Sequence, residues 1–237
     1  MDASGYVTLS RQSGLMREMQ VVANNIANAS TTGFRREGLV FSEHVVRLEN
    51  APSLSMANGN ARQIDLSEGG LSETGGTFDF AIQGDGFFLV DTPQGQQLTR
   101  AGSFTPSADG ELMTADGHRL LDQGGAPVFV PPDARSVSLG RDGTLSADGQ
   151  PLTRVGLWQP TDPLKLQRQA GTLFASPSGV QPMEDGVVLQ GFVEDSNVNA
   201  VTEVTRMIEV QRAYEMGQGL LDREDDRIRS VIRTLGR

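Results

Sequence analysis

The sequence predicts an α+β fold in which a long helix at each end of the chain flanks a central antiparallel β domain. Residues 3–28 and 199–235 predict the helices, because their apolar side chains recur at alternating steps of three and four. The segment between them predicts the β domain, because six Asp-Gly pairs lie among short runs of β-type residues. A 3-4 spacing is that of a coiled-coil seam, so we expect the N- and C-terminal helices to pair as a coiled coil.

The predicted N-terminal helix covers residues 3–28. Its seam consists of Leu15, Met19, Val22 and Ile26, which are separated by four, three and four residues. Asn, Ser and Thr side chains from residue 28 onward, and then a glycine, end the helix by offering the backbone non-helical alternatives.

The predicted C-terminal helix begins at Asn199, a favourable N-cap residue, with Glu203 near the positive end of the helix dipole. No proline interrupts it. A small domain does not need two long amphipathic ends, so we expect them to pack on each other or on neighbouring subunits. The C-terminal seam consists of Met207, Val210, Tyr214, Gly217, Leu221, Glu224, Ile228, Val231 and Leu235, flanked by Val204 and Ile208.

The middle of the chain has recurring turn signals between short β-type runs, which is typical of an antiparallel β domain. Asp-Gly occurs at 85–86, 109–110, 116–117, 142–143, 148–149 and 185–186, and β-type runs occur at 87–90, 127–130, 137–140 and 187–193. Asp-Gly between such runs predicts hairpins with type I′ turns. We expect residues 34–75 to form an irregular connector with a short helical start at 38–48. The predicted organisation is a helix in 1–33, the connector in 34–75, the β domain in 76–193 and a helix in 194–237.

Charge and composition exclude several classes of protein. The net charge is −10, from 20 basic and 30 acidic residues, and no segment offers the basic face that nucleic acid requires. No apolar run approaches the ~18 residues of a membrane span, so we expect no membrane insertion. The chain has no cysteine, and its start lacks the basic and apolar regions of a signal peptide. We therefore expect it either to stay in the cytoplasm or to leave by a route that does not cleave it.

No motif in the sequence indicates catalysis. His44 and His118 are isolated from other metal-ligand types, and no nucleophile elbow of the form G-x-S-x-G occurs. The Gly-rich stretches at 84–87 and 217–220 are not followed by the Lys-Ser/Thr of a phosphate loop. The Asp-Gly turns lack the alternating ligands of a calcium loop. We predict no enzyme activity, catalytic residue, cofactor or metal site.

A polar stripe lies beside the C-terminal seam. Gln211, Arg212 and Glu215 are three or four residues apart on a helix and flank the apolar seam. Such a stripe sets register and partner choice in coiled coils. A solvated helix with one buried tyrosine explains it equally well, and both interpretations stay open.

Several stretches resemble the bacterial flagellar rod and hook proteins. "ANNIANASTTGF" at 23–34 is similar to their N-terminal signature, and "FDFAIQGDGFFLV" at 78–90, continued at 98–121, is similar to their central segment. "LQGFVEDSNVNAVTEVTRMIEVQRAYE" at 189–215 resembles their C-terminal signature. Within the family, residues 5–20, the ending at 225–236 and the short connector most resemble the proximal-rod type, with the distal-rod type next. Ser30 and the pair Arg35-Arg36 depart from the family pattern, where Asn and a single Lys are usual.

The resemblance implies a structural, non-enzymatic subunit of the flagellar basal body. Such proteins leave the cell uncleaved through the flagellar type III export apparatus. They then stack helically with copies of themselves and with neighbouring rod proteins, here the other proximal-rod subunits and the distal-rod protein. The product is the drive shaft that crosses the periplasm. The resemblance also implies that the terminal helices pair in an inner tube while the β domain faces outward.

The asparagine-rich stretch gains an interpretation from this resemblance. We expect Asn24, Asn25 and Asn28 to bond laterally to neighbouring subunits, with a plain C-terminal cap as the alternative. Residues 32–34 would turn the chain outward, with a phenylalanine packed against the tube wall. The expected assembly residues are Leu15, Met19, Val22, Asn24, Asn25, Ile26, Asn28, Thr32, Gly33, Phe34, Met207, Val210, Gln211, Arg212, Tyr214, Glu215, Leu221 and Ile228.

Three alternatives to a proximal-rod subunit remain at this point. The first is a distal-rod or other axial flagellar protein. The second is a hydrolase of the cell wall, which requires a pocket with converging carboxylates. The third is a soluble adaptor whose helical ends bind one partner at fixed stoichiometry.

Overall fold

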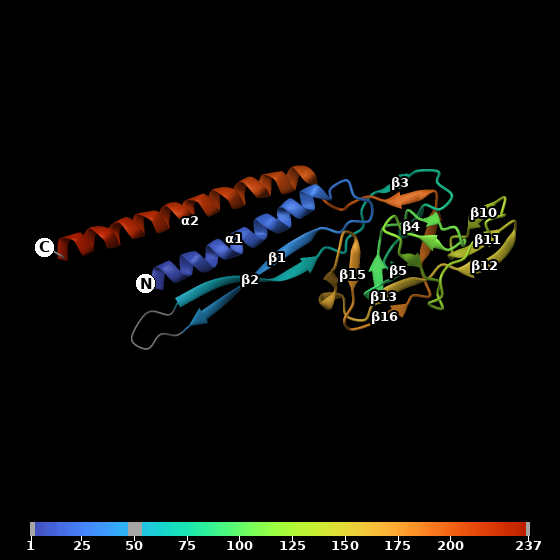
Figure 1. Ribbon diagram of the computed structural model, residues 1–237, viewed down its shortest axis with the longest axis horizontal. Coiled ribbons are helices and arrows are strands. Elements are labelled where there is room, and N and C mark those ends of the chain that lie inside the picture. The colour runs from blue at the N-terminus through green and yellow to red at the C-terminus, as the bar shows by residue number, and fades with distance from the viewer. Residues whose placement is uncertain (1–2, 47–53, 236–237) are drawn as a thin grey trace. The chain divides into compact units, whose positions relative to one another are not determined.

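A computed structural model describes residues 3–46 and 54–235 of the chain (Figure 1). The chain divides into two compact units. The first, here called the terminal unit, contains residues 1–27, 37–65 and 199–237. The second, here called the β unit, contains residues 28–36 and 66–198.

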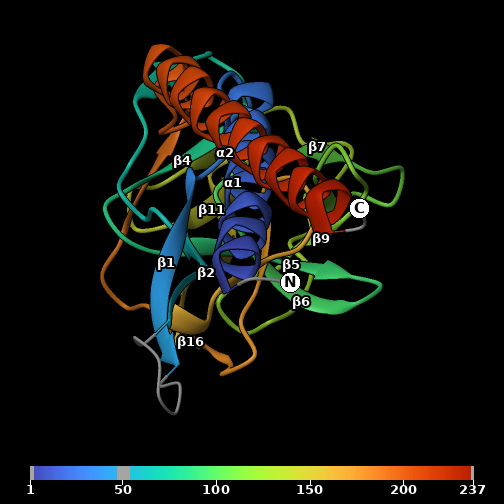
Figure 2. The ribbon, with the colours of Figure 1, turned by 90° about the vertical axis from the view of Figure 1, so that its left-hand side faces the viewer.

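The terminal unit consists of two helices and one hairpin. Helix α1 (Ala3–Ala27) contacts α2 (Ala200–Leu235) and the antiparallel hairpin of β1 (Glu37–Val46) and β2 (Leu54–Ile64) (Figures 1 and 2). Both helices therefore form where the apolar spacing predicts them. Asn199 caps α2, because its Oδ1 accepts a hydrogen bond from the backbone N of Thr202 at 3.1 Å.

The short helix predicted at 38–48 is wrong, because the described part of this segment is strand β1. Val40, Phe41, Val45 and Val46 favour extended backbone, and β2 supplies an antiparallel partner for it. Residues 47 and 48 lie outside the described part of the chain.

The β unit is built from short strands, and every strand pair in its described residues is antiparallel. The largest sheet runs β14-β15-β6-β5-β9-β8-β7, and β13 pairs with both β5 and β16. Smaller sheets are β10-β11-β12, β17-β4 and β18-β3. The strands are β3 (Leu71–Glu73), β4 (Phe80–Gln83), β5 (Phe87–Thr92), β6 (Gly95–Thr99), β7 (Thr105–Pro106), β8 (Leu112–Met113), β9 (Arg119–Leu120), β10 (Val137–Leu139), β11 (Thr144–Ala147), β12 (Gln150–Arg154), β13 (Leu157–Pro160), β14 (Gln167–Arg168), β15 (Leu173–Ala175), β16 (Val180–Pro182), β17 (Val187–Gln190) and β18 (Phe192–Glu194), with a 3-10 turn η1 (Pro163–Lys165) between β13 and β14.

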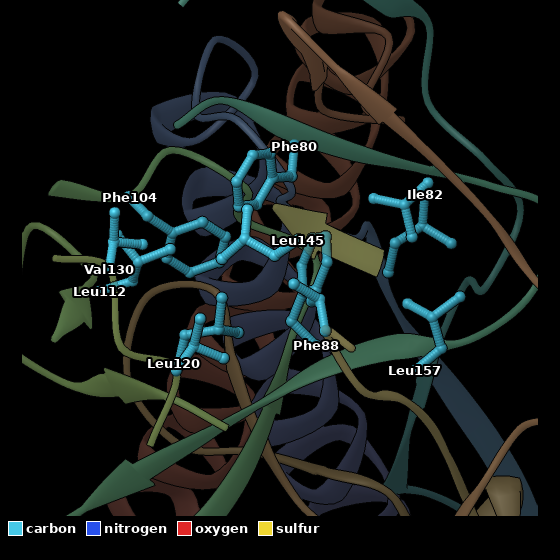
Figure 3. Close-up of a cluster of buried hydrophobic side chains, with 12 residues drawn as sticks. Phe80, Ile82, Phe88, Phe104, Leu112, Leu120, Val130, Leu145 and Leu157 are labelled. Atoms are coloured by element: carbon cyan, nitrogen blue, oxygen red, sulfur yellow. The ribbon is translucent and has the colours of Figure 1, made fainter. Parts of the chain in front are cut away.

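The core of the β unit is a cluster of buried apolar side chains (Figure 3). Within it, the ring centroid of Phe104 lies 5.8 Å from that of Phe80 and 5.4 Å from that of Phe88. Leu112, Leu120 and further side chains from several strands complete the cluster. The chain thus closes one apolar core from strands that are far apart in sequence.

The Asp-Gly pairs mark turns, but most are not the predicted type I′ turn. Four of the six connect consecutive paired strands, at 109–110, 116–117, 142–143 and 148–149. Only Asp148-Gly149 has positive φ at both residues, 49° and 79°. In the other five pairs the aspartate has no positive φ. Where the glycine of such a pair has a positive φ, that one residue is enough to reverse the direction of the chain. The predicted run at 127–130 forms isolated bridges rather than a strand.

Candidate assembly surface

The predicted seam residues of α1 and α2 lie in the terminal unit, where the two helices contact each other. Leu15, Val22 and Val210 are buried. Two seam residues near the C-terminal end of α2, Ile228 and Val231, are 42% and 49% exposed. The seam residues Met19, Ile26, Met207, Tyr214 and Leu221 are half-buried. The coiled-coil geometry of this pair stays a prediction.

Asn25 holds three segments of the terminal unit together. Its side chain is 0% exposed, and its Nδ2 donates to the backbone O of Glu37 at 2.8 Å and to Oε2 of Glu203 at 3.0 Å. Its Oδ1 accepts from the backbone N of Glu37 at 3.0 Å. The amide therefore connects α1, β1 and α2 within the chain, and a lateral bond from Asn25 to another subunit stays a prediction.

The other asparagines of the motif differ from Asn25. Asn24 is exposed on α1, so a lateral role stays a prediction for it. Asn28 lies in the β unit, where its Oδ1 accepts from Thr31 Oγ1 and its backbone O accepts from Thr31 N. These bonds form a local turn directly after the end of α1, and both the lateral bond and the plain cap stay predictions for Asn28.

Glu18 and Arg206 form an ion pair between α1 and α2. Arg206 Nη2 lies 2.5 Å from Glu18 Oε1, and Arg206 Nε donates to the same oxygen at 2.8 Å. This hydrogen bond to a carboxylate raises the pKa of Arg206. A second glutamate, Glu209, lies on α2 itself, 3.3 Å from the guanidinium. Because the arginine is half exposed, each of these ion pairs contributes only about 0–1 kcal/mol.

Gln12 fills the space left by a helical glycine. Its Nε2 donates to the backbone O of Tyr214 at 2.9 Å, and a Cβ added to Gly217 would lie 2.5 Å from that nitrogen. The glycine, a flaw in the apolar seam, is thus the place where a polar side chain crosses between the helices. Gln12 lies three residues before Leu15 and therefore occupies the preceding seam position. A polar residue at a seam position is a signal that could have indicated this contact between the helices.

A hollow of about 410 Å³ lies beside this crossing. Oε1 of Gln12 is buried and has no partner among the described residues. Two residues of the predicted polar stripe, Gln211 and Glu215, bond to each other at 3.0 Å on α2, and Arg212 is exposed. The hollow is lined by Thr8, Arg11, Gln12, Leu15, Ala213, Met216, Gly217 and Leu220.

Residues 32–34 lie in the β unit. Gly33 has φ +70°, and an added Cβ there would collide with the backbone at Ala101, so only glycine fits this turn. Phe34 is 1% exposed, and the guanidinium of Arg168 lies 4.2 Å from its ring centroid. Phe34 is thus buried within its own unit, and its expected place against a tube wall stays a prediction. Thr32 is half-buried.

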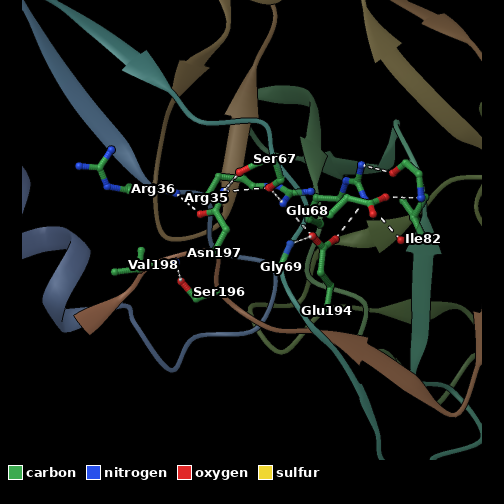
Figure 4. Close-up of polar contacts among 12 residues, drawn as sticks. Arg35, Arg36, Ser67, Glu68, Gly69, Ile82, Glu194, Ser196, Asn197 and Val198 are labelled. Atoms are coloured by element: carbon green, nitrogen blue, oxygen red, sulfur yellow. Dashed lines mark hydrogen bonds and ion pairs between the residues drawn. The ribbon is translucent and has the colours of Figure 1, made fainter. Parts of the chain in front are cut away.

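A buried ion-pair cluster joins the entry and exit segments of the β unit (Figure 4). Oε1 of Glu194 lies 2.8 Å from Arg35 Nη1, and its Oε2 lies 3.0 Å from Arg100 Nη1. The same carboxylate accepts from the backbone N of Gly69 at 2.9 Å. Burial lowers the pKa of Arg100, and Glu194 opposes that effect.

Neighbouring backbone groups complete this connection. Asn197 accepts at Oδ1 from the backbone N of Arg36 at 2.6 Å and donates through Nδ2 to the backbone O of Ser67 at 2.9 Å. The cluster could not be predicted from the sequence, since its partners are up to 159 residues apart and no local pattern links them. Its role is to fix where the chain enters and leaves the β unit.

Within the described residues there is no group of three or more His, Cys, Asp or Glu side chains placed to hold a metal ion. None of the helices in that part of the chain is long and apolar enough to span a membrane. His118 is half-buried in the β unit, and the side chain of His44 lies outside the described residues.

Comparison with known proteins adds family matches along most of the chain. Residues 6–35 match the profile of "Flagella basal body rod protein", residues 81–147 that of "Flagellar hook protein FlgE/F/G D1 domain", and residues 189–234 that of "Flagellar basal body rod FlgEFG protein C-terminal". The chain is 41% identical to the flagellar basal-body rod protein FlgF of Mesorhizobium japonicum, over 100% of this chain and 99% of the relative. It is 37% identical to FlgF of Caulobacter vibrioides over the same shares, and 30% identical to FlgG of Bacillus subtilis over 96% and 97%.

Proposed function

The chain belongs to the flagellar basal-body rod protein family, and we propose that it is a subunit of the proximal rod that assembles into the flagellar drive shaft. It is a structural protein and not an enzyme. Its higher identity to FlgF than to FlgG favours the proximal over the distal rod. The hydrolase alternative is thereby set aside.

The observation that carries this proposal is the unequal burial of α2. Toward its N-terminal end, α2 packs on α1 and buries Val210. Yet Val201 is 78% exposed and Met216 is 71% exposed, and further apolar side chains face solvent at Leu220 and Ile232. A helix that exposes this much apolar surface needs additional partners, and stacked subunits would supply them.

The terminal helices would then form the inner tube as a coiled coil. Segments 1–33 and 194–237 would supply its two helices, and residues 76–193 would form an outer domain. The 3-4 spacing of the seams and the contacts between α1 and α2 support this arrangement. The partners would be further copies of this chain and other rod proteins, and the location the flagellar basal body within the periplasm. Export would use the flagellar type III apparatus without cleavage of a signal peptide.

Concentration-dependent assembly of the purified full-length chain tests the proposal. We expect sedimentation velocity and negative-stain electron microscopy to show open-ended stacks that lengthen as the concentration rises, alone or with an adjoining rod protein. Growth that stops at a fixed small stoichiometry would favour the adaptor alternative. A chain that stays monomeric with and without its rod partners would overturn the proposal.

A further inference from the structure

One side chain that lines the hollow between α1 and α2 has a buried acceptor without a donor among the described residues. Gln12 is 8% exposed and lines the hollow, and its Oε1 has no partner among the described residues. The orientation of the amide is fixed, since exchanging its oxygen and nitrogen would place two oxygens together at the Tyr214 carbonyl. A buried acceptor without a donor is unfavourable, so the site suits an incoming N–H group.

A second surface, here called the outer face of α2, offers such a group. Val201, Val204, Ile208, Arg212 and Glu215 follow one another at steps of three and four and therefore share one side of the helix. All five are exposed. Neither the hydrogen bonds nor the ion pairs found within the described residues include the Arg212 side chain. The outer face thus combines apolar side chains with an available cation.

Charge favours a second copy of the chain as the partner. Within α1 and α2 together there are 8 arginines and 8 acidic residues, so the helices are neutral as a pair. The β unit carries 9 basic and 17 acidic residues. Copies of the chain repel one another through the β unit but not through the helices, which makes the helices the surface where like copies can approach.

We propose that the outer face of α2 in one copy docks on the hollow of the next, with Arg212 donating to Gln12 Oε1 and Glu215 pairing with Arg11. Arg11 is exposed at the hollow. The two surfaces are different parts of one molecule, so the contact repeats without closing and generates an open stack. This inference rests on the proposed function, because it identifies which surfaces of a self-assembling subunit meet.

Disulfide trapping tests the contact directly, because the chain has no cysteine of its own. Ile208→Cys places a thiol on the outer face, and Met216→Cys places one at the hollow; both side chains are exposed, so neither substitution disturbs a core. We expect the double variant to give an oxidised ladder of multimers under assembly conditions. A mixture of the two single variants should give the mixed dimer. The matched control pairs Met216→Cys with Gln94→Cys, an exposed position in the β unit, and should give no ladder.

A charge exchange tests the pairing. Arg11→Glu and Glu215→Arg should each lower the rate of cross-linking by about tenfold, because each places like charges together. The double variant Arg11→Glu with Glu215→Arg should restore most of the rate, which a purely structural role of either residue would not produce.

Sedimentation measures assembly in parallel with cross-linking, so that a failure of this contact can be distinguished from a failure of the proposed function. Stacks that form without a ladder, or a double charge variant no better than the singles, would overturn this contact and leave the proposed function intact. A chain that does not associate with its own copies under any condition would overturn the contact together with self-assembly.

Discussion

The two units of the molecule differ in how completely they bury their apolar side chains. In the β unit, Phe88, Leu112 and Leu145 are fully buried, and the buried arginines pair with Glu194. In the terminal unit, the apolar side chains of Val201 and Met216 on α2 are mostly exposed. The β unit is therefore built to be stable by itself, whereas the helices are built to gain stability from association.

The largest loss of stability is expected from a substitution of Glu194 in the β unit. Glu194→Ala leaves Arg35 and Arg100 buried without their carboxylate, and breaking a buried ion pair in this way costs about 3–5 kcal/mol. Chemical denaturation followed by Trp158 fluorescence, which reports the β unit, should show a correspondingly lower midpoint. Glu184→Ala removes an exposed carboxylate of the same unit and serves as the control, with a change of about 0.5 kcal/mol or less. Equal effects of the two substitutions would contradict the structural role of the cluster.

Gly33→Ala should produce the next largest loss, again in the β unit. The substitution forces a side chain into positive φ and into the backbone at Ala101, and we expect a cost of about 2–4 kcal/mol. Gly75 has nearly the same φ, +68°, but a Cβ there would meet nothing within 4 Å. Gly75→Ala should therefore cost only about 1 kcal/mol. Thermal unfolding of both variants measures the difference, and indistinguishable midpoints would show that the close approach to Ala101 is unimportant.

Asn25→Ala tests whether the Asn25 side chain holds α1, β1 and α2 together in the terminal unit. It leaves the backbone N and O of Glu37 and the carboxylate of Glu203 without their shared partner, at a cost of about 1–3 kcal/mol. Hydrogen exchange should accelerate in α1, β1 and the start of α2, with no change in the β unit. Asn24→Ala, at an exposed position, is the control. Acceleration confined to the β unit would refute the assignment.

The sequence was sufficient to predict the elements whose signal is local. The 3-4 spacing predicted both helices to within one residue, and Asn199 could be identified as an N-cap from its position alone. The resemblance added the family, which the comparisons confirm. Strand β1 was missed because a short apolar run does not distinguish helix from strand until its partner β2 is known.

The candidate site was less predictable, because its chemistry depends on contacts between distant residues. The asparagine motif predicted hydrogen bonds but not their partners, because the partners of Asn25 lie 12 and 178 residues away in the sequence. Phe34 was expected at an assembly surface, yet Arg168, far along the chain, covers its ring. Burial of this kind is a property of the tertiary structure, so residue type and spacing did not reveal it.

The smallest expected effect compares the two glycines of α2. A Cβ at Gly219 would meet nothing within 4 Å, so Gly219→Ala should stabilise the helix by about 1 kcal/mol, the usual difference in helix propensity. At Gly217 the same gain is opposed by displacement of Gln12 from the Tyr214 carbonyl, a hydrogen bond of about 1 kcal/mol, so little net change is expected. Far-UV circular dichroism of the full-length variants at low concentration measures helix content without the contribution of assembly. A larger gain for Gly217→Ala than for Gly219→Ala would mean that the Gln12 crossing does not hold α1 against α2, and the terminal unit would then depend on neighbouring subunits even more than its exposed side chains indicate.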